Sequence, residues 1–136
     1  MRVIEQDLIE QLRLDAEKSP RLRSHCLLHS NHDEVVQRLL IGFVKGSFVE
    51  PHYHALAHQW EMFAVLHGVL EVKVYDDCGN VTKQFNVGND MRLPNLIEFS
   101  PNDTHSIKCL SDFALLLEVK EGPFDPKHAK STPSWL

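Results

Sequence analysis

The chain has 136 residues and is acidic, with 19 Asp and Glu against 14 Lys and Arg and a formal net charge of -5. This length suits one domain and is enough to bury an apolar core. The lack of a basic cluster argues against a nucleic-acid partner, and no apolar run is long enough to cross a bilayer. The N-terminus has no apolar segment, so we expect no signal peptide. Three widely spaced cysteines then indicate reduced thiols and a cytoplasmic protein.

The predicted elements begin with one amphipathic helix. Apolar residues recur at helical spacing from Ile4 to Glu17, and Ser19-Pro20 ends the pattern because the residue before proline avoids helical dihedral angles. From residue 21 onward, short runs rich in Val, Ile, Leu and Phe alternate with turn residues. This pattern predicts strands at 22–28, 35–43, 48–54, 60–66, 69–75, 82–87, 96–99, 104–110 and 112–120. Many short strands without a second helix favour a closed or sandwiched all-β fold.

The last segment, 121–136, contains three prolines and no periodic apolar pattern. We expect an irregular tail that packs against the strands, with Phe124 and Trp135 as its anchors. The chain therefore divides into a helical segment at 1–20, strands at 21–120 and this tail, all within one domain.

His52 and His54 form the most informative motif. Side chains two positions apart in a strand point to the same face, about 6.6 Å apart along the chain, so both imidazoles could bind one metal ion. The alternative is two solvated histidines at a strand end. Glu61 and His105 each begin another predicted strand. An inward carboxylate among apolar side chains is costly without a positive partner, and a metal ion would be such a partner.

Two stretches resemble the motifs of cupins. The series Gly46-x5-His52-x-His54-x6-Glu61-x6-Gly68 resembles the first cupin motif, and Pro101-Asn-Asp-Thr-His105 resembles the second. This resemblance implies a double-stranded β-helix, the cupin jelly roll. It also implies one divalent metal ion with four ligands, His52, His54, Glu61 and His105.

A closer resemblance extends over most of the chain. Pro20-Arg-Leu-Arg23, Glu50-Pro51-His52-Tyr53-His54 and Leu117-Glu-Val-Lys-Glu-Gly-Pro123 look like the WbuC family of cupin-fold metalloproteins, which is associated with O-antigen and other surface-polysaccharide gene clusters. The resemblance implies a metal-dependent enzyme that acts on a small polar molecule such as a sugar or sugar nucleotide. It also implies a homodimer. The reaction would be isomerisation, epimerisation or oxygen-dependent oxidation. A non-catalytic carbohydrate-binding cupin, with a structural or ligand-capturing metal, is the alternative.

The ligand set leaves two questions open. Three imidazoles and one carboxylate suit Fe, Mn, Zn, Ni, Co or Cu equally. The loop between His54 and Glu61 is longer than in most cupins and contains His58, which could replace or join Glu61 as a ligand. In the second motif, Asn102 stands where the usual pattern has glycine, and asparagine tolerates a positive φ.

Other residues match the same resemblance and could line the mouth of the barrel as substrate ligands, namely His29, Arg38 and Lys120. For an anionic ligand Arg38 is the natural anchor, because its planar fork pairs with carboxylate or phosphate. An ion pair between Arg38 and Glu118 is the structural alternative. With Glu61 as a ligand, no separate general base is evident. Cys109 is expected to be a buried apolar filler, and His25 to be solvated.

Overall fold

The computed structural model describes residues 1–136 as one helix and nine strands. In chain order these are α1 (Gln6–Lys18), β1 (Arg23–Leu27), β2 (Val36–Val44), β3 (Phe48–His52), β4 (Glu61–His67), β5 (Val69–Tyr75), β6 (Val81–Gly88), β7 (Leu96–Phe99), β8 (Thr104–Cys109) and β9 (Phe113–Glu121). Each element lies within two residues of the range that the sequence pattern predicts. The prediction of an all-β fold with one N-terminal helix is therefore confirmed.

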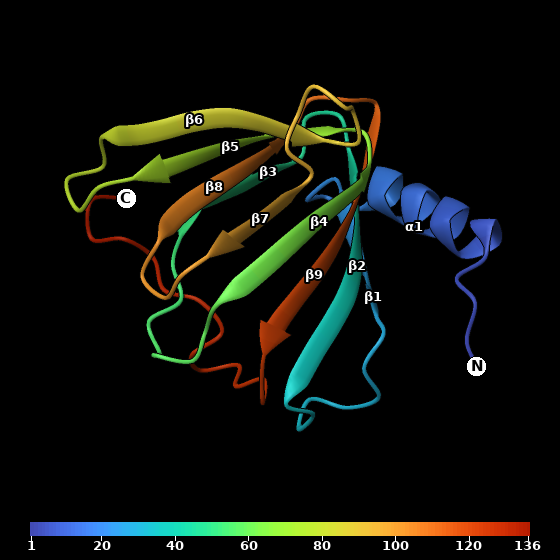
Figure 1. Cartoon of the computed structure of the whole chain (residues 1–136), viewed down its shortest axis with the longest axis horizontal. Coiled ribbons are helices and arrows are strands. Elements are labelled where there is room, and N and C mark those ends of the chain that lie inside the picture. The colour runs from blue at the N-terminus through green and yellow to red at the C-terminus, as the bar shows by residue number, and fades with distance from the viewer.

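The strands form two antiparallel sheets that face each other (Figure 1). The larger sheet has the order β1-β2-β9-β4-β7, and the smaller has the order β3-β8-β5-β6. Strands adjacent in sequence often lie in different sheets, as β3 and β4 do. This exchange of strands between two facing sheets is the arrangement of a jelly roll.

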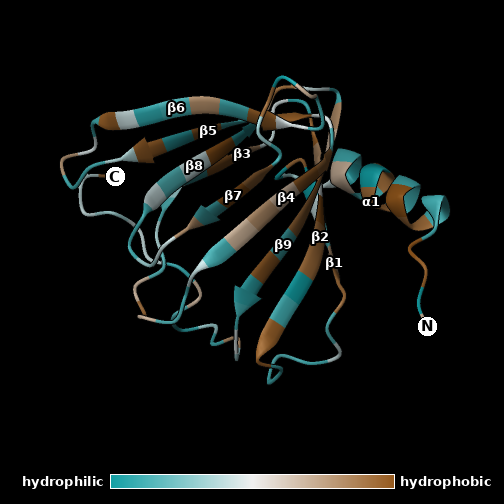
Figure 2. Cartoon of the chain, in the orientation of Figure 1, coloured by the Kyte–Doolittle hydropathy of each residue, from teal (hydrophilic) through white to brown (hydrophobic).

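The apolar core lies between the sheets. Hydrophobic segments run along strands of both sheets in Figure 2. Leu70 of β5 and Leu116 of β9 are among its most buried members, with 0% and 1% of their surface exposed. Truncation of such a side chain to alanine typically costs about 2–5 kcal/mol. Cys109 also belongs to this core, as predicted, and none of the three cysteines forms a disulfide.

Helix α1 covers the outer face of the larger sheet beside β1 and β2 (Figure 1). Its Leu12 forms a second apolar cluster with Leu40 and Leu115, and the hydroxyl of Ser24 donates to the Leu12 carbonyl at 2.6 Å. The helix is neither long nor apolar enough to span a membrane. The buried residues of the helix, Leu12 and Ala16, lie in its C-terminal half, so this half makes the contact with the sheet.

The C-terminal tail folds back over the open end of the sandwich. Tyr53 and Ser131 exchange two backbone hydrogen bonds, of 3.1 and 2.8 Å. Further along, the ring of Trp135 packs 5.4 Å from that of Tyr75. The Phe124 amide donates to the His32 carbonyl at 2.8 Å. These contacts hold the tail beside the residues that follow β3.

Candidate metal centre

Three predicted ligands converge between the two sheets. His52 ends β3 and is the register partner of His105 in β8, whereas Glu61 begins β4 in the opposite sheet. One ligand atom from each of these residues lies within 4.8 Å of the other two. The carboxylate of one sheet therefore faces two imidazoles of the other.

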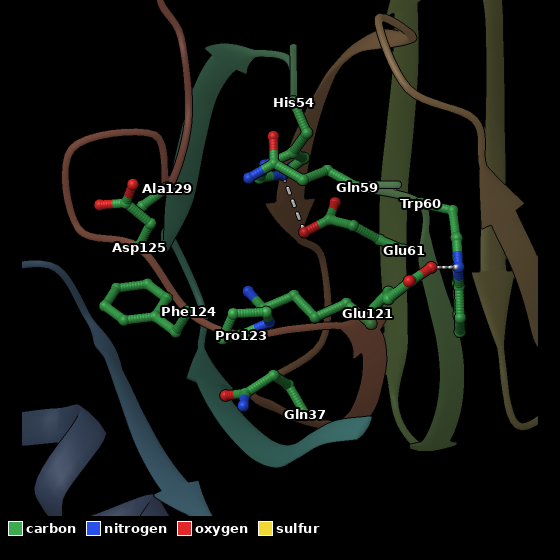
Figure 3. A pocket seen from close by; sticks show the side chains of 11 residues that line it. Gln37, His54, Gln59, Trp60, Glu61, Glu121, Pro123, Phe124, Asp125 and Ala129 are labelled. Carbon is green, nitrogen blue, oxygen red and sulfur yellow. Dashed lines mark hydrogen bonds and ion pairs between the residues drawn. The ribbon is translucent and has the colours of Figure 1, made fainter. Parts of the chain in front are cut away.

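His54 adds a third imidazole, although it lies outside the strand in which we predicted it. The register of β3 shifts between Val49 and His52, and the strand ends at His52. The His54 carbonyl then accepts from the Asn102 amide at 2.8 Å, which ties this segment to the turn before β8. Its Nε2 lies 2.9 Å from Glu61 Oε1, as the dashed line in Figure 3 marks.

The turn before β8 depends on Asn102. This residue has a φ of 70°, as predicted from its place in the second motif. Only glycine and a few polar residues adopt this left-handed conformation readily. The turn places His105 at the start of the inner strand β8, where none of its surface is exposed.

Backbone carbonyls fix the orientation of two imidazoles. Nδ1 of His52 lies 2.9 Å from the Glu50 carbonyl, and Nδ1 of His105 lies 2.9 Å from the Asp103 carbonyl. A carbonyl oxygen only accepts, so each Nδ1 carries a proton, which leaves Nε2 of each ring to present a lone pair to a metal ion. This arrangement is typical of metal-binding histidines.

The atoms that face one another in the cluster lack hydrogen-bond partners. His54 Nε2, His105 Nε2 and Glu61 Oε2 are buried and make no hydrogen bond of normal geometry. His105 Nε2 lies 3.4 Å from Glu61 Oε2, so a lone pair and a carboxylate oxygen oppose each other. Buried polar atoms are nearly always satisfied, and a cation between these acceptors would satisfy all of them. The four residues therefore fit a divalent metal ion.

The protonation states suit this interpretation. Burial lowers the pKa of His52 to about 4, with a further contribution from His105. Burial alone would raise the pKa of Glu61, but proton donation from Nε2 of His105 and His54 would outweigh it and hold that pKa below its usual range, and a cation bound in place of these protons would act in the same direction. At neutral pH the cluster thus contains an anionic carboxylate and an imidazole that readily loses its proton, which are the forms that bind metals.

The cluster borders a cavity of about 380 Å³ between the sheets. His52, His54 and Glu61 form part of its wall, and His105 lies behind them. Much of the remaining wall is apolar, namely Leu39, Ile41, Phe43, Val49, Phe63, Ile107 and Leu116. At roughly 30 Å³ for each water-sized atom, this volume admits about a dozen non-hydrogen atoms. A small molecule could therefore enter beside the cluster.

A smaller hollow separates the cluster from the tail. It has a volume of about 20 Å³, and His54, Glu61 and Phe124 are among the residues around it (Figure 3). This space is enough for one water molecule. Phe124 also lines the larger cavity, so the tail forms part of both walls.

Of the three predicted substrate ligands, only Lys120 lies in the cavity wall. Arg38 lies between the inward-facing Gln37 and Leu39 on β2, so its side chain points to the outer face, where it pairs with Glu34 at 3.1 Å. His29 is buried against the Arg38 backbone and is not part of the cavity wall.

The structure does not contain either of two alternative contacts that the sequence suggested. The predicted ion pair between Arg38 and Glu118 is absent. Glu118 pairs instead with Lys120, with 2.6 Å between Oε1 and Nζ. His58 lies in the loop before β4 and takes no part in the cluster or the cavity wall, whereas Glu61 does.

Glu118 lines the cavity, whereas the sequence suggested for it only an ion pair with Arg38. It is 6% exposed, and its register partner in β4 is Phe63. Burial and the nearby Glu61 carboxylate raise its pKa, although Lys120 opposes this effect. The alternation of Leu116, Glu118 and Lys120 along β9 was the available signal, since these positions share one face of a strand.

His25 is exposed, as predicted, but it also borders the cavity from β1, which the sequence did not indicate. Partial burial lowers its pKa to about 4, and the positive charges of Arg21, Arg23 and Lys120 add to this shift. The sequence carried no local signal for this position, because the cavity wall depends on how β1 faces the opposite sheet.

Comparison with known proteins gives the same architecture. A cupin superfamily protein from Desulfitobacterium hafniense is 14% identical, with 73% of this chain and 76% of that chain covered and a TM-score of 0.54. A conserved protein of unknown function from Streptococcus pyogenes is 14% identical, with coverage of 76% and 78% and a TM-score of 0.55.

Oxalate decarboxylase from Bacillus subtilis is 24% identical over 71% of this chain, with a TM-score of 0.55. The chain spans 23% of that enzyme, so the likeness concerns the fold of one part of it. No curated protein matches the sequence. Residues 4–87 match the family described as a domain of unknown function (DUF6016). The chain thus belongs to the DUF6016 family and has the jelly-roll fold of the cupin superfamily.

Proposed function

We propose that this protein is a metal-dependent enzyme that acts on a small polar molecule bound in the cavity of about 380 Å³. The observation that carries the proposal is the buried carboxylate of Glu61, which faces Nε2 of His54 and His105 at 2.9 and 3.4 Å beside that cavity. With His52, these residues would hold the ion. A bound divalent ion would supply a Lewis acid or an activated water there.

Glu118 supports a catalytic role over simple binding. It is the one carboxyl group of the cavity wall outside the ligand cluster. Lys120 holds it at 2.6 Å, and it faces the space in which a small molecule would lie. A positioned carboxyl group can accept a proton from a substrate and return it. Among the expected reactions, this arrangement favours isomerisation or epimerisation over oxidation.

The substrate class follows from the cavity and from the resemblance to the WbuC family. Room for about a dozen non-hydrogen atoms suits one sugar ring rather than a whole sugar nucleotide. The resemblance adds surface-polysaccharide synthesis as the setting and a homodimer as the assembly. A carbohydrate-binding cupin without catalysis is the second candidate, and the cavity wall, half apolar and half polar or charged, is compatible with it.

The first test is the metal content of the untagged, full-length protein and two variants. We expect one divalent ion per chain in the wild type, its loss in His105→Ala, and full retention in His58→Ala, which removes an imidazole outside the cluster. Equal metal content in the two variants, or none in the wild type, contradicts the proposal.

The second test separates an enzyme from a binding protein. Metal-loaded protein is incubated in D₂O with a panel of monosaccharides, and NMR follows exchange of carbon-bound hydrogen. We expect exchange with the wild type and its loss in Glu118→Gln, while the metal content of that variant stays unchanged. Binding of a sugar without exchange would favour the non-catalytic candidate.

A further inference from the structure

The cavity wall carries an excess of positive charge. Arg21, Arg23, Lys120 and Lys130 line it, and we call these four residues the basic collar. They come from three separate parts of the chain, namely the segment that enters β1, the end of β9 and the tail. The only carboxylates in the same wall are Glu61 and Glu118. This concentration contrasts with the net charge of -5 for the whole chain.

Both carboxylates already have partners. Glu118 pairs with Lys120, and Glu61 faces the histidines of the cluster. Arg23 donates to the Phe48 carbonyl at 3.1 Å, and the negative charge of Glu50 favours its protonated form by raising its pKa. The side chains of Arg21 and Lys130 make no hydrogen bond or ion pair within the chain, and both are exposed. Two positive groups thus remain available at the cavity.

The effect of these charges is visible on their neighbours. The pKa of Arg23 is lowered by burial and by the charge of Arg21. The pKa of His25 is lowered to about 4, with contributions from burial and from three members of the collar. Like charges are therefore gathered at the rim of the cavity, and two of them, Arg23 and Lys120, are partly buried. An anion bound among them would relieve this repulsion.

We propose that Arg21 and Lys130 bind an oxyanion, a carboxylate or a phosphate, on a small molecule whose other end reaches the metal cluster. This substrate class rests on the proposed function of the cluster. The Arg21 guanidinium can bind two oxygens of either group at once, and Lys130 adds a point charge. The cavity has room for one sugar ring, and the charged group attached to it would lie at the exposed rim beside Arg21 and Lys130. Arg38, one of the residues expected from the sequence to anchor an anion, points away from the cavity.

The test compares four ligands on metal-loaded, full-length protein by isothermal titration calorimetry. Glucose 6-phosphate carries a phosphate, glucuronate carries a carboxylate, glucose is neutral, and inorganic phosphate lacks the sugar. We expect at least one of the two charged sugars to bind about tenfold or more tightly than glucose. The affinity of that ligand should also fall as salt is added. Whether glucose 6-phosphate or glucuronate binds more tightly distinguishes phosphate from carboxylate.

The variant Arg21→Gln/Lys130→Gln should lose most of this preference, with about tenfold weaker binding of the charged sugar and unchanged binding of glucose. The control Lys83→Gln/Lys108→Gln removes the same charge from exposed positions of β6 and β8 and should behave as the wild type. Thermal melting checks that both double variants are folded. Arg23 is left intact because its contact with Phe48 links β1 to β3.

Three results would overturn the proposal that Arg21 and Lys130 bind an oxyanion. They are equal affinity for charged and neutral sugars, no binding of any ligand, and an unchanged preference in the double variant. The metal content of the same samples tests the cluster separately. A metal-loaded protein without preference for anions refutes the collar alone. A protein that prefers anions yet holds no metal refutes the proposed function and supports the oxyanion site.

Discussion

Glu61→Gln is the sharpest single perturbation of the metal centre. The side chain is 3% exposed and its two oxygens face His54 and His105. Glutamine has nearly the same shape, so packing is preserved while the negative charge and one ligand oxygen are lost. We therefore expect metal affinity to fall about 100-fold, with little change in the fold.

The stability effect follows from the linkage of binding to folding. At a free metal concentration of about 100 times Kd, binding stabilises the native state by about 2.7 kcal/mol. A Kd raised about 100-fold reduces this contribution to about 0.4 kcal/mol at the same concentration. For a chain of this size, about 4 °C of Tm corresponds to each kcal/mol. The difference in Tm between metal-loaded and chelated protein should thus shrink from about 10 °C to about 2 °C.

Differential scanning calorimetry with and without chelator measures this difference for the wild type, Glu61→Gln and His58→Ala. His58→Ala is the control and should keep the full wild-type difference. The reasoning is refuted if chelation leaves the wild-type Tm unchanged, or if Glu61→Gln responds to metal as strongly as the wild type does.

Three further predictions concern the fold. Gly68→Ala should destabilise the protein by about 2 kcal/mol or more, because φ is +74° and a Cβ would collide with the Phe113 carbonyl. Gly46→Ala should cost roughly 1 kcal/mol, since its Cβ would have room, and urea unfolding compares the two variants. Burial raises the pKa of Cys109 to about 11, so the thiol loses its proton at lower pH in the unfolded chain than in the native protein. The free energy of unfolding should therefore fall by about 2–3 kcal/mol between pH 9 and pH 11. An equally steep fall in Cys109→Ala would contradict this cause. A thiol reagent at pH 8 should modify exposed Cys78 quickly and Cys109 only after denaturation, and mass spectrometry of the labelled peptides would reveal the reverse order.

Local features of the chain were predictable because they depend on nearby residues. Helix α1 and the nine strands followed from apolar spacing and from turn residues, and their ends shifted by at most two positions. The positive φ of Asn102 agreed with the tolerance of asparagine for this conformation at the glycine position of the second motif. The convergence of His52, His54, Glu61 and His105 was anticipated through the cupin-like motifs rather than through any local pattern.

The errors all concern which side of a strand meets which neighbour. Arg38 was singled out through the resemblance to the WbuC family, yet the pleat of β2 directs Gln37 and Leu39 inward and Arg38 outward. His54 was expected in β3, but a register shift ended the strand before it. Glu118 forms its ion pair with Lys120 of its own strand β9 rather than with Arg38 of the adjacent strand β2.

Spacing along the chain thus determined where strands start and stop, because backbone dihedral angles and side-chain alternation are set within a few residues. Only the tertiary structure decided that Glu61 of one sheet faces His105 of the other, and that Arg21 and Lys130 border one cavity. These meetings depend on how two sheets stack and where the tail crosses them. Such contacts join residues far apart in the chain, and no local pattern encodes their distance.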